Sequence, residues 1–434
     1  MKHLWSMRTK YGLWLRVELA VLWARMLARE ITRDTYRRVR DAAKYSVRRI
    51  TFLDEGPSGF RHDMNAFIEN VKERLRKAGV PEDMVNRFHE SVTSYDVEDP
   101  AFMLQLVRSL DLIIKELAKL RVALVTRAQE HKHTAMMGVT HGQWAEPITL
   151  GAKFVVYIEA LERDLERLRT ARGQLTVGKF AGIVGVYGNL TPQLEAAACR
   201  RLGQRPVLGT QIIHRDIHAQ YMAALAILAS NLEHVALNIW LMCQSCRGEA
   251  REPFRANQRG SSRAPHKKNP ILGENLRGLA AAVRGFQSMA QEMIATADER
   301  DISQSCVERI AWPGATSIVH FMLVRLTSVI KGVEFFPDRM LVNIAASQGQ
   351  TASGYVKDLL IRSGVEVLPF DGVDRPIYEW VQACAFAAWP NRHLKDEMID
   401  RGLLGFVARY DLDQCFDIDW QLRNIDGIFE RAGI

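Results

Sequence analysis

Apolar residues at helical spacing, in three long stretches, restrict the fold of this chain more than any other feature. In residues 112–125, isoleucine and leucine recur at intervals of three and four, and residues 158–168 and 225–239 show a similar pattern. This spacing places apolar side chains on one face of an α-helix, whereas a half-buried strand would alternate apolar and polar residues. Strand signals are nearly absent, so we expect an all-α protein built on long helices.

Short segments rich in glycine, proline and polar residues separate these helices. With a chain of 434 residues, of which 47% are hydrophobic, more than one domain is expected. The segments predict three helical domains, at residues 1–92, 93–340 and 341–434, and the middle one is a bundle of long helices. Helices with apolar stripes on more than one face need further partners, which predicts an oligomer.

Charge, cysteine content and hydropathy exclude several classes of function. Lysine and arginine exceed acidic residues by 58 to 50, a modest excess that suits an anionic small molecule as well as nucleic acid, which we do not expect as the main partner. The six cysteines show no disulfide framework and no zinc-site spacing, which predicts reduced thiols in a cytosolic protein without a metal. Charged residues interrupt the apolar run at residues 13–27, which argues against a membrane span and a signal peptide.

The segment at residues 260–270 concentrates the most potential chemistry. It reads Gly-Ser-Ser-Arg-Ala-Pro-His-Lys-Lys-Asn-Pro, with two hydroxyl groups, one imidazole and three cations. Gly260 predicts unusual backbone angles in a mobile loop, and Asn269-Pro270 predicts a helix N-cap followed by the first helical residue. The positive end of that helix and the two lysines favour an anionic ligand. By spacing alone, a basic surface loop that caps a helix is the better explanation of the segment.

This loop resembles the signature of the fumarase/aspartase superfamily, Gly-Ser-Ser-x-x-Pro-x-Lys-x-Asn-Pro. The resemblance is strongest to the adenylosuccinate lyases, and it covers nearly the whole chain in the expected order. The further matching segments are Arg61-His62-Asp63, Thr93-Ser94-x-Asp96, Thr140-His141-Gly142-Gln143, Gln211 with Arg215-Asp216-x-His218, and Glu299-Arg300-Asp301-Ile302-Ser303-x-Ser305 with Glu308-Arg309. Fumarases, aspartases and argininosuccinate lyases share the lysine loop but not the run that begins at Glu299.

The resemblance implies a fold, an assembly and a reaction. The fold is fumarase/aspartase-like, and four copies share one helical core, with each active site assembled from three subunits. The reaction is elimination of fumarate from adenylosuccinate to give AMP, and from succinylaminoimidazole-carboxamide ribotide, in purine biosynthesis. No cofactor is expected. The alternatives are a fumarate-releasing lyase of the same superfamily that acts on another N-succinyl compound, and a non-catalytic relative.

Such an elimination needs one group that removes a proton beside a carboxylate and another that protonates the departing nitrogen. The resemblance assigns the first role to Ser261 and the second to His141. An isolated serine is too weak a base, so we expect Lys267 and the following helix N-terminus to lower its pKa. The alternative for Ser261 is a local hydrogen bond within a turn. His62 is expected near the substrate phosphate, where it helps to position or charge His141.

The remaining site residues are assigned to substrate binding by the same resemblance. Ser262, Lys267 and Asn269 are expected to bind the succinyl carboxylates. Arg300, Ser305 and Arg309 are expected to hold the phosphate, because the forked donors of arginine suit phosphate oxygens, and Glu308 is expected to orient them. Further ligand contacts are expected from Arg61, His62, Asp63, Thr93, Ser94, Gln211 and Asn275.

The chain departs from the family pattern at several places, of which the start and the loop bear on the site. The family normally begins with an Arg-Tyr pair that contacts the phosphate, and this sequence starts at Met1, within the turn that follows the pair. Either the start is truncated or the contacts are absent, and if they are absent we expect weaker nucleotide binding with unchanged chemistry. Within the loop, Arg263 stands where the family usually has alanine, and we expect its side chain to point outward rather than toward Ser261.

Overall fold

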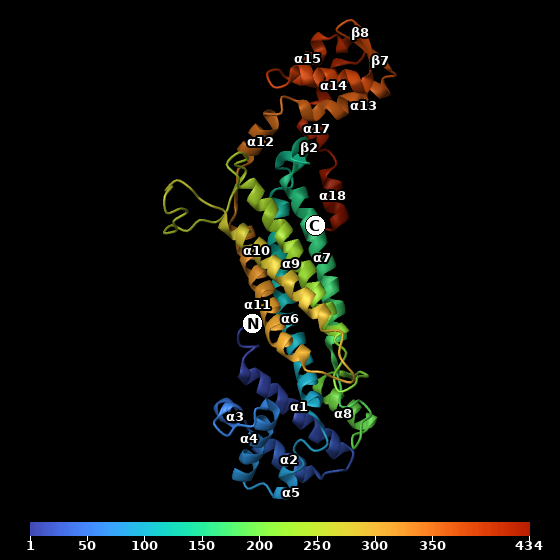
Figure 1. Ribbon diagram of the computed structural model, residues 1–434. Helices are drawn as coiled ribbons and strands as arrows, with labels where there is room; N and C mark the ends of the chain where they lie inside the picture. The colour runs from blue at the N-terminus through green and yellow to red at the C-terminus, as the bar shows by residue number, and fades with distance from the viewer. The chain divides into compact units, whose positions relative to one another are not determined.

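The computed structural model describes all residues from 1 to 434, and helices make up most of it (Figure 1). The helices are α1 (Met7–Leu27), α2 (Arg33–Ala42), α3 (Val47–Glu55), α4 (Asp63–Lys77), α5 (Glu82–Val85), α6 (Ser94–Glu130), α7 (Leu150–Leu175), α8 (Pro192–Leu202), α9 (Asp216–Met242), α10 (Ile271–Glu292), α11 (Ser303–Gly332), α12 (Pro337–Ala345), α13 (Ser353–Arg362), α14 (Ile377–Ala388), α15 (Leu394–Asp400), α16 (Arg409–Cys415), α17 (Ile418–Gln421) and α18 (Ile425–Ala432). Two 3₁₀ turns lie at Gln350–Ala352 and Leu403–Gly405. The expected all-α class is confirmed.

Four small sheets, each of two strands, complete the secondary structure. The strands are β1 (Ala135–Thr140), β2 (Gln143–Thr149), β3 (Val177–Gly178), β4 (Arg205–Pro206), β5 (Ala250–Arg251), β6 (Glu334–Phe335), β7 (Val367–Phe370) and β8 (Val373–Pro376). All pairs are antiparallel except the parallel pair β3 and β4. The three apolar stretches predicted from the sequence fall inside the long helices α6, α7 and α9, as expected.

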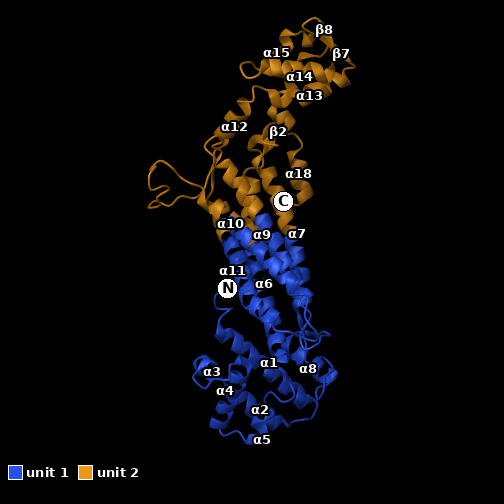
Figure 2. Cartoon of the chain, in the orientation of Figure 1, with its two compact units in different colours: residues 1–117, 163–232, 278–324 blue, residues 118–162, 233–277, 325–434 orange.

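The chain forms two compact units, each assembled from three separate stretches (Figure 2). The first unit comprises residues 1–117, 163–232 and 278–324, and the second comprises residues 118–162, 233–277 and 325–434. Five long helices, α6, α7, α9, α10 and α11, contribute residues to both units. The division into three domains at residues 92 and 340 remains our proposal.

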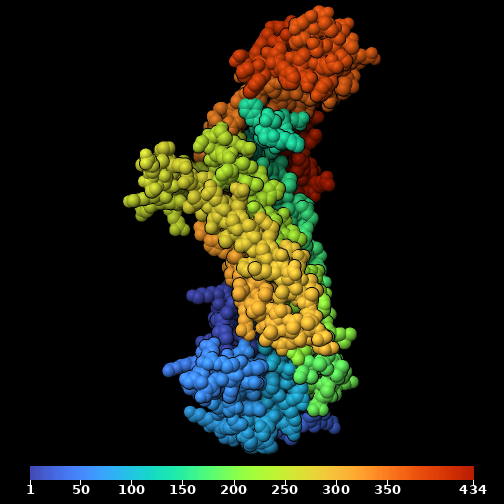
Figure 3. Space-filling view, viewed as in Figure 1, coloured from blue at the N-terminus to red at the C-terminus, as the bar shows by residue number.

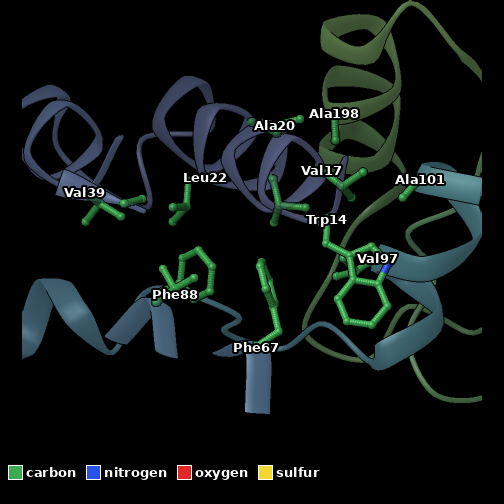
Figure 4. Packing of buried hydrophobic residues seen from close by; sticks show 14 of the residues in the cluster. Trp14, Val17, Ala20, Leu22, Val39, Phe67, Phe88, Val97, Ala101 and Ala198 are labelled. Atoms are coloured by element: carbon green, nitrogen blue, oxygen red, sulfur yellow. The ribbon is translucent and has the colours of Figure 1, made fainter. Parts of the chain in front are cut away.

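The first unit has an aromatic and aliphatic core around α1 and α4 (Figure 4). The ring of Trp14 meets the ring of Phe67 edge to face, with centroids 5.5 Å apart, and both side chains are almost completely buried. Rings of this size bury roughly 150–250 Å² each, so they contribute much of the stability of such a core. The Ser6 side chain accepts a hydrogen bond from the Thr9 amide and caps α1.

The second unit has its own core in helices α13 to α16. Its centre is Trp380 of α14, which is fully buried and donates its indole N–H to the carbonyl oxygen of Pro369. Elsewhere in this unit, the segment between β5 and α10 extends away from the neighbouring helices and is prominent on the surface (Figure 3). The protrusion contains the segment at residues 260–270.

Two helices, α9 and α11, are long and apolar enough to cross a membrane by length and composition alone. Of their most apolar windows, 56% and 50% respectively are buried inside the protein, as is usual for core helices. The apolar run at residues 13–27 does not qualify, and α1, which contains it, packs in the core of the first unit.

Candidate active site

His141 lies at the tip of a β-hairpin in the second unit. Thr140 pairs with Gln143, so His141 and Gly142 form a two-residue turn, with φ of 54° and 79°. Positive φ at both central residues is the geometry of a type I′ turn, and glycine adopts it without strain at the second position. The sequence predicted only a break between helices here. The hairpin presents the exposed imidazole beyond its strands.

Two contacts hold this hairpin against other parts of the second unit. The Tyr355 hydroxyl donates a hydrogen bond of 3.0 Å to the Glu146 carboxylate, and this contact and burial raise the pKa of Tyr355 to about 12, with burial the larger cause. The rings of Trp144 and Trp389 meet edge to face, with centroids 5.8 Å apart. The hairpin is therefore tied to the C-terminal helices by side chains on β2.

The segment at residues 260–270 is an irregular loop, as predicted, and its two ends are joined directly. The side-chain amide of Asn269 donates a hydrogen bond of 3.0 Å to the carbonyl oxygen of Gly260. A Cβ atom on Gly260 would lie 1.8 Å from the carbonyl oxygen of Lys267, so only glycine fits at this crossing. The expectation of unusual backbone angles at Gly260 was wrong, because its φ is not positive. The requirement is close approach of two backbone segments.

Asn269 was also predicted to cap the helix that follows, and this was wrong. Helix α10 begins at Ile271, and its free amides at Leu272 and Gly273 donate to the carboxylate of Glu252 at 3.0 and 2.8 Å. Glu252 is 7% exposed, and burial raises the pKa of its carboxyl group although these two hydrogen bonds act against the rise. The helix N-terminus is thus occupied by an internal anion.

The Ser261 hydroxyl accepts a hydrogen bond of 3.1 Å from the amide of Ala264. This is the local turn bond that was the alternative to a catalytic role. Ser262, Arg263 and Lys267 are exposed on the same loop, and the outward position expected for Arg263 is confirmed in this chain. The His141 side chain forms no hydrogen bond or ion pair with the loop. The two predicted proton-transfer groups therefore stand on separate segments of one unit.

The first unit gathers most of the residues predicted to bind phosphate around one cavity of about 230 Å³. Its lining comes from four regions: the end of α3, the start of α4 with the turn before it, the first two turns of α6, and the start of α11 with the segment before it. The predicted residues that line it are Arg61, His62, Asp63, Ser94, Arg300, Ser305 and Arg309. We refer to it as the arginine cavity. Segments far apart in sequence are thus brought together within one unit.

Asp63 is the lining carboxylate of this cavity that pairs with cations. It accepts a hydrogen bond of 2.8 Å from the Lys10 ammonium and lies 4.0 Å from the Arg309 guanidinium. Burial would raise the pKa of Asp63, but the charge and hydrogen bond of Lys10, with the charge of Arg309, lower it below its ordinary value. Asp63 therefore stays ionised, and it partly neutralises the charge of Arg309, which is one of the candidate phosphate ligands.

Arg300 is fixed by neutral partners. Its guanidinium donates to the Gln211 side chain at 2.6 Å and stacks 3.8 Å above the ring of Tyr95. Gln211 in turn donates to the carbonyl oxygen of Ile183 at 2.9 Å. Because neither partner is charged, the positive charge of Arg300 remains available to a ligand. Gln211 acts on the site through this contact and does not line the arginine cavity.

A buried ionic network supports the wall of the cavity formed by α11. Arg215, 1% exposed, donates to both oxygens of Asp99 at 3.0 and 3.1 Å and to Glu308 at 2.8 and 3.4 Å. Glu308 lies on α11 beside Arg309 and one turn after Ser305. Glu308 thus pairs with Arg215 and forms no ion pair with Arg300 or Arg309, so its orienting role stays a prediction.

A second buried pair fixes the start of α6. The Lys179 ammonium donates to Asp96 at 2.7 Å, and both side chains are fully buried. Asp96 also accepts a hydrogen bond of 3.0 Å from the backbone amide of Thr93. This arrangement orients Ser94, which lines the arginine cavity, whereas Thr93 does not.

Four lining residues of the arginine cavity were not predicted as site residues: Asp54, Tyr95, Glu98 and Ile302. Glu98 lies on α6 one helical turn after Ser94, and it also lines an adjoining cavity of about 440 Å³. Its spacing from Ser94 was visible in the sequence, but nothing there showed that the helix turns this face toward three arginines. No group of three or more histidine, cysteine, aspartate or glutamate side chains is arranged to hold a metal ion.

A family model described as Lyase matches residues 16–285 of the chain. Similar curated proteins include adenylosuccinate lyases from Synechocystis sp., 36% identical over 438 residues, and Bacillus subtilis, 34% identical over 437 residues. Each alignment covers 100% of this chain and 98% of the relative. An adenylosuccinate lyase from Thermotoga maritima is 36% identical over 434 residues and covers 99% of this chain and 97% of its own length.

Solved structures of enzymes with different names share the fold. A fumarate lyase from Mesorhizobium sp. matches with a TM-score of 0.86 at 22% identity, over 99% of this chain and 96% of its own. A 3-carboxy-cis,cis-muconate lactonizing enzyme from Pseudomonas putida matches with a TM-score of 0.85 at 24% identity, over 99% of this chain and 95% of its own. The fumarase/aspartase-like fold expected from the sequence is confirmed.

Proposed function

Because this chain belongs to the adenylosuccinate lyases, a family of carbon–nitrogen lyases, we propose that it eliminates fumarate from adenylosuccinate to release AMP. The observation that carries the proposal is the similarity over the full chain to curated adenylosuccinate lyases. By the same family relation, succinylaminoimidazole-carboxamide ribotide is its second substrate. The reaction belongs to purine biosynthesis, and the free cysteines suit a cytoplasmic enzyme.

In this proposal Ser261 is the general base and His141 the general acid. Proton removal beside a carboxylate and protonation of the leaving nitrogen call for two groups on different segments, and the loop and the hairpin supply them. The Ala264 amide supports the role of Ser261, because a hydrogen bond donated to the oxygen favours its deprotonated form. The turn bond and the catalytic role are therefore compatible.

The charge that develops on the substrate carboxylate during proton removal needs nearby donors and cations. Lys267 and Ser262 are exposed on the loop, and Asn269 lies at its closing end, so all three serve as the proposed carboxylate ligands. Asn275, exposed on α10, is a further proposed contact. No metal or organic cofactor takes part in the proposed mechanism.

The arginine cavity is the proposed phosphate site. Arg300 and Arg309 offer charged donors, and Ser94 and Ser305 offer hydroxyl groups. The Nδ1 atom of His62 accepts a hydrogen bond from the backbone amide of Asn65 at the start of α4, so Nε2 is the ring nitrogen that is left for a ligand. The proposed contacts at the edge of this site are Arg61, Asp63, Thr93 and Gln211.

We further propose a homotetramer with active sites shared between subunits. Large apolar side chains are exposed on several long helices, which is unusual for a helix face that meets only water. They are Val156, Ile227, Met289, Ile310, Phe321 and Val324. Neither nucleic acid nor a membrane is a proposed partner.

Loss of ultraviolet absorbance from adenylosuccinate, with fumarate measured independently, tests the activity. The proposed function predicts both signals with purified protein and none with heat-denatured protein. A second candidate is release of fumarate from a different N-succinyl compound, and the three carboxylates Asp54, Asp63 and Glu98 around the arginine cavity favour it. Fumarate from a phosphate-free N-succinyl amine, with none from adenylosuccinate, would establish that second function instead.

A further inference from the structure

Glu98 occupies an unusual position for a carboxyl group. It lines the arginine cavity with Ser94, Arg300 and Arg309, and on the other side it lines the adjoining cavity of about 440 Å³. Residues four apart share one face of a helix, so Glu98 and Ser94 project from α6 in the same direction. The side chain is half-buried, and its carboxyl group forms no hydrogen bond or ion pair.

Three of the acidic groups close to Glu98, namely Asp63, Asp99 and Glu308, already have cationic partners. Lys10 of α1 pairs with Asp63 at the start of α4, and Arg215 at the start of α9 pairs with both Asp99 and Glu308. The remaining charged or titratable groups that face the two cavities are Asp54 and Glu55 of α3, Arg61, His62, Tyr11, Tyr95, Arg300 and Arg309. Arg300, held by neutral Gln211 and Tyr95, keeps its charge free.

An ionised Glu98 and a phosphate group would repel each other in this confined space. A protonated carboxyl group, in contrast, carries no charge and can donate its O–H to a phosphate oxygen. Glu98 therefore opposes phosphate binding when its carboxyl group is ionised and assists it when the group is protonated.

We propose that Glu98 is a specificity-determining residue of the arginine cavity, which admits a phosphate monoester only when the Glu98 carboxyl group is protonated. Binding of the phosphate is then coupled to uptake of one proton. The identity of the ligand as a nucleotide monophosphate rests on the proposed function, whereas the coupling rests on the geometry of the cavity.

The surroundings of Glu98 raise the pKa of its carboxyl group to near neutral pH. Burial is the largest cause and raises the pKa of Glu98 to about 7. The positive charge of Lys10 lowers this pKa, the negative charges of Asp63 and Asp99 raise it, and the positive charge of Arg300 lowers it. At pH 6 about nine-tenths of the free protein is then competent to bind, and at pH 8 about one-tenth. The apparent affinity for phosphate should therefore fall about tenfold between these pH values.

Calorimetric titration of the full chain with AMP, from pH 6 to pH 8, tests the coupling. AMP has its own phosphate ionisation near pH 6, so the informative quantity is the ratio of dissociation constants between wild type and Glu98→Gln. We expect this ratio to rise about tenfold from pH 6 to pH 8, because the variant keeps an uncharged group at every pH. A ratio that stays constant would overturn the proposal.

A second measurement needs no variant. At pH 8 AMP is already a dianion, so titrations of wild type in two buffers of different ionisation enthalpy should show uptake of about one proton per AMP bound. Absence of proton uptake would overturn the coupling. The matched control is Glu55→Gln, which removes an exposed carboxylate from the adjoining cavity and should leave the proton uptake unchanged.

Two further results separate this inference from the proposed function. Protein that takes up a proton with AMP but releases no fumarate from adenylosuccinate would refute the function and support the role of Glu98. Protein that cleaves adenylosuccinate but binds AMP with the same pH profile in wild type and Glu98→Gln would support the function and refute the role. Adenosine, which lacks the phosphate, should bind without proton uptake, and uptake with adenosine would overturn the assignment to phosphate.

Discussion

Replacement of Arg215 by methionine should destabilise the first unit strongly, because it leaves two carboxylates buried. Arg215, Asp99 and Glu308 are 1%, 1% and 8% exposed, and the guanidinium is the only cation that pairs with either acid. Asp99 would keep one hydrogen bond, from the Ile213 amide at 2.6 Å. Removal of one member of a buried ion pair costs roughly 3–5 kcal/mol.

For a unit of this size, each kcal/mol changes the unfolding temperature by about 2–4 °C, so Arg215→Met should lower it by about 6–20 °C at pH 7.5. Calorimetry or circular dichroism at a fixed scan rate measures this change. The control is Arg172→Met, which removes an exposed pair with Asp111 and should cost less than about 1 kcal/mol. Equal unfolding temperatures for Arg215→Met and Arg172→Met would refute the reasoning.

The pH dependence provides an independent check on the cause. Burial raises the pKa of Glu308 while the charge and hydrogen bond of Arg215 lower it, so removal of Arg215 moves the folded-state pKa of Glu308 further above its unfolded value. The folded variant then binds more protons than the unfolded chain, so its stability rises as pH falls through that pKa. The difference in unfolding temperature between wild type and Arg215→Met should therefore shrink from pH 7.5 to pH 5. A difference that grows on acidification would exclude unpaired carboxylates as the cause.

Three other changes test the proposed site. Ser261→Ala should lower turnover by several orders of magnitude with little change in substrate binding, and near-normal turnover would dismiss Ser261 as the base. His141→Ala should lose turnover similarly, and mixed tetramers of the two variants should regain activity; no rescue in verified mixtures would argue against sites shared between subunits. Gly260→Ala should lower turnover at least tenfold without changing the unfolding temperature, because the clash with the Lys267 carbonyl displaces an exposed loop, and unchanged kinetics would show that the loop adapts.

The sequence predicted the helices well because their signal is local. The apolar spacing in residues 112–125 and 225–239 depends only on which residues share a helix face, and both stretches are helical. The hairpin that carries His141 was missed because its strands are short and its turn depends on pairing between Thr140 and Gln143. Its Thr-His-Gly-Gln run was visible, but the two positive φ values were not.

The spacing of residues in the sequence could not predict contacts between distant segments. Asn269 and Pro270 had the residue types of a helix start, yet Glu252, which lies many residues earlier, supplies the cap. Glu98 was not predicted as a site residue, because cations and hydroxyl groups are the residue types expected to bind phosphate. Only the packing of α6 beside the segment before α11 shows a carboxyl group among arginines.

The cap at α10 also changes how the loop would activate Ser261 in the proposed role of base. The sequence suggested that the positive end of the helix and Lys267 together favour an alkoxide. Because the Glu252 carboxylate engages the amides of Leu272 and Gly273, it offsets the partial positive charge at that end. The remaining sources of stabilisation are the Ala264 amide, which already donates to the hydroxyl, and the lysine side chains. A loop held closed by Gly260 and Asn269 keeps the amide in place, so in the proposed mechanism the lysines supply the electrostatic stabilisation of the deprotonated Ser261.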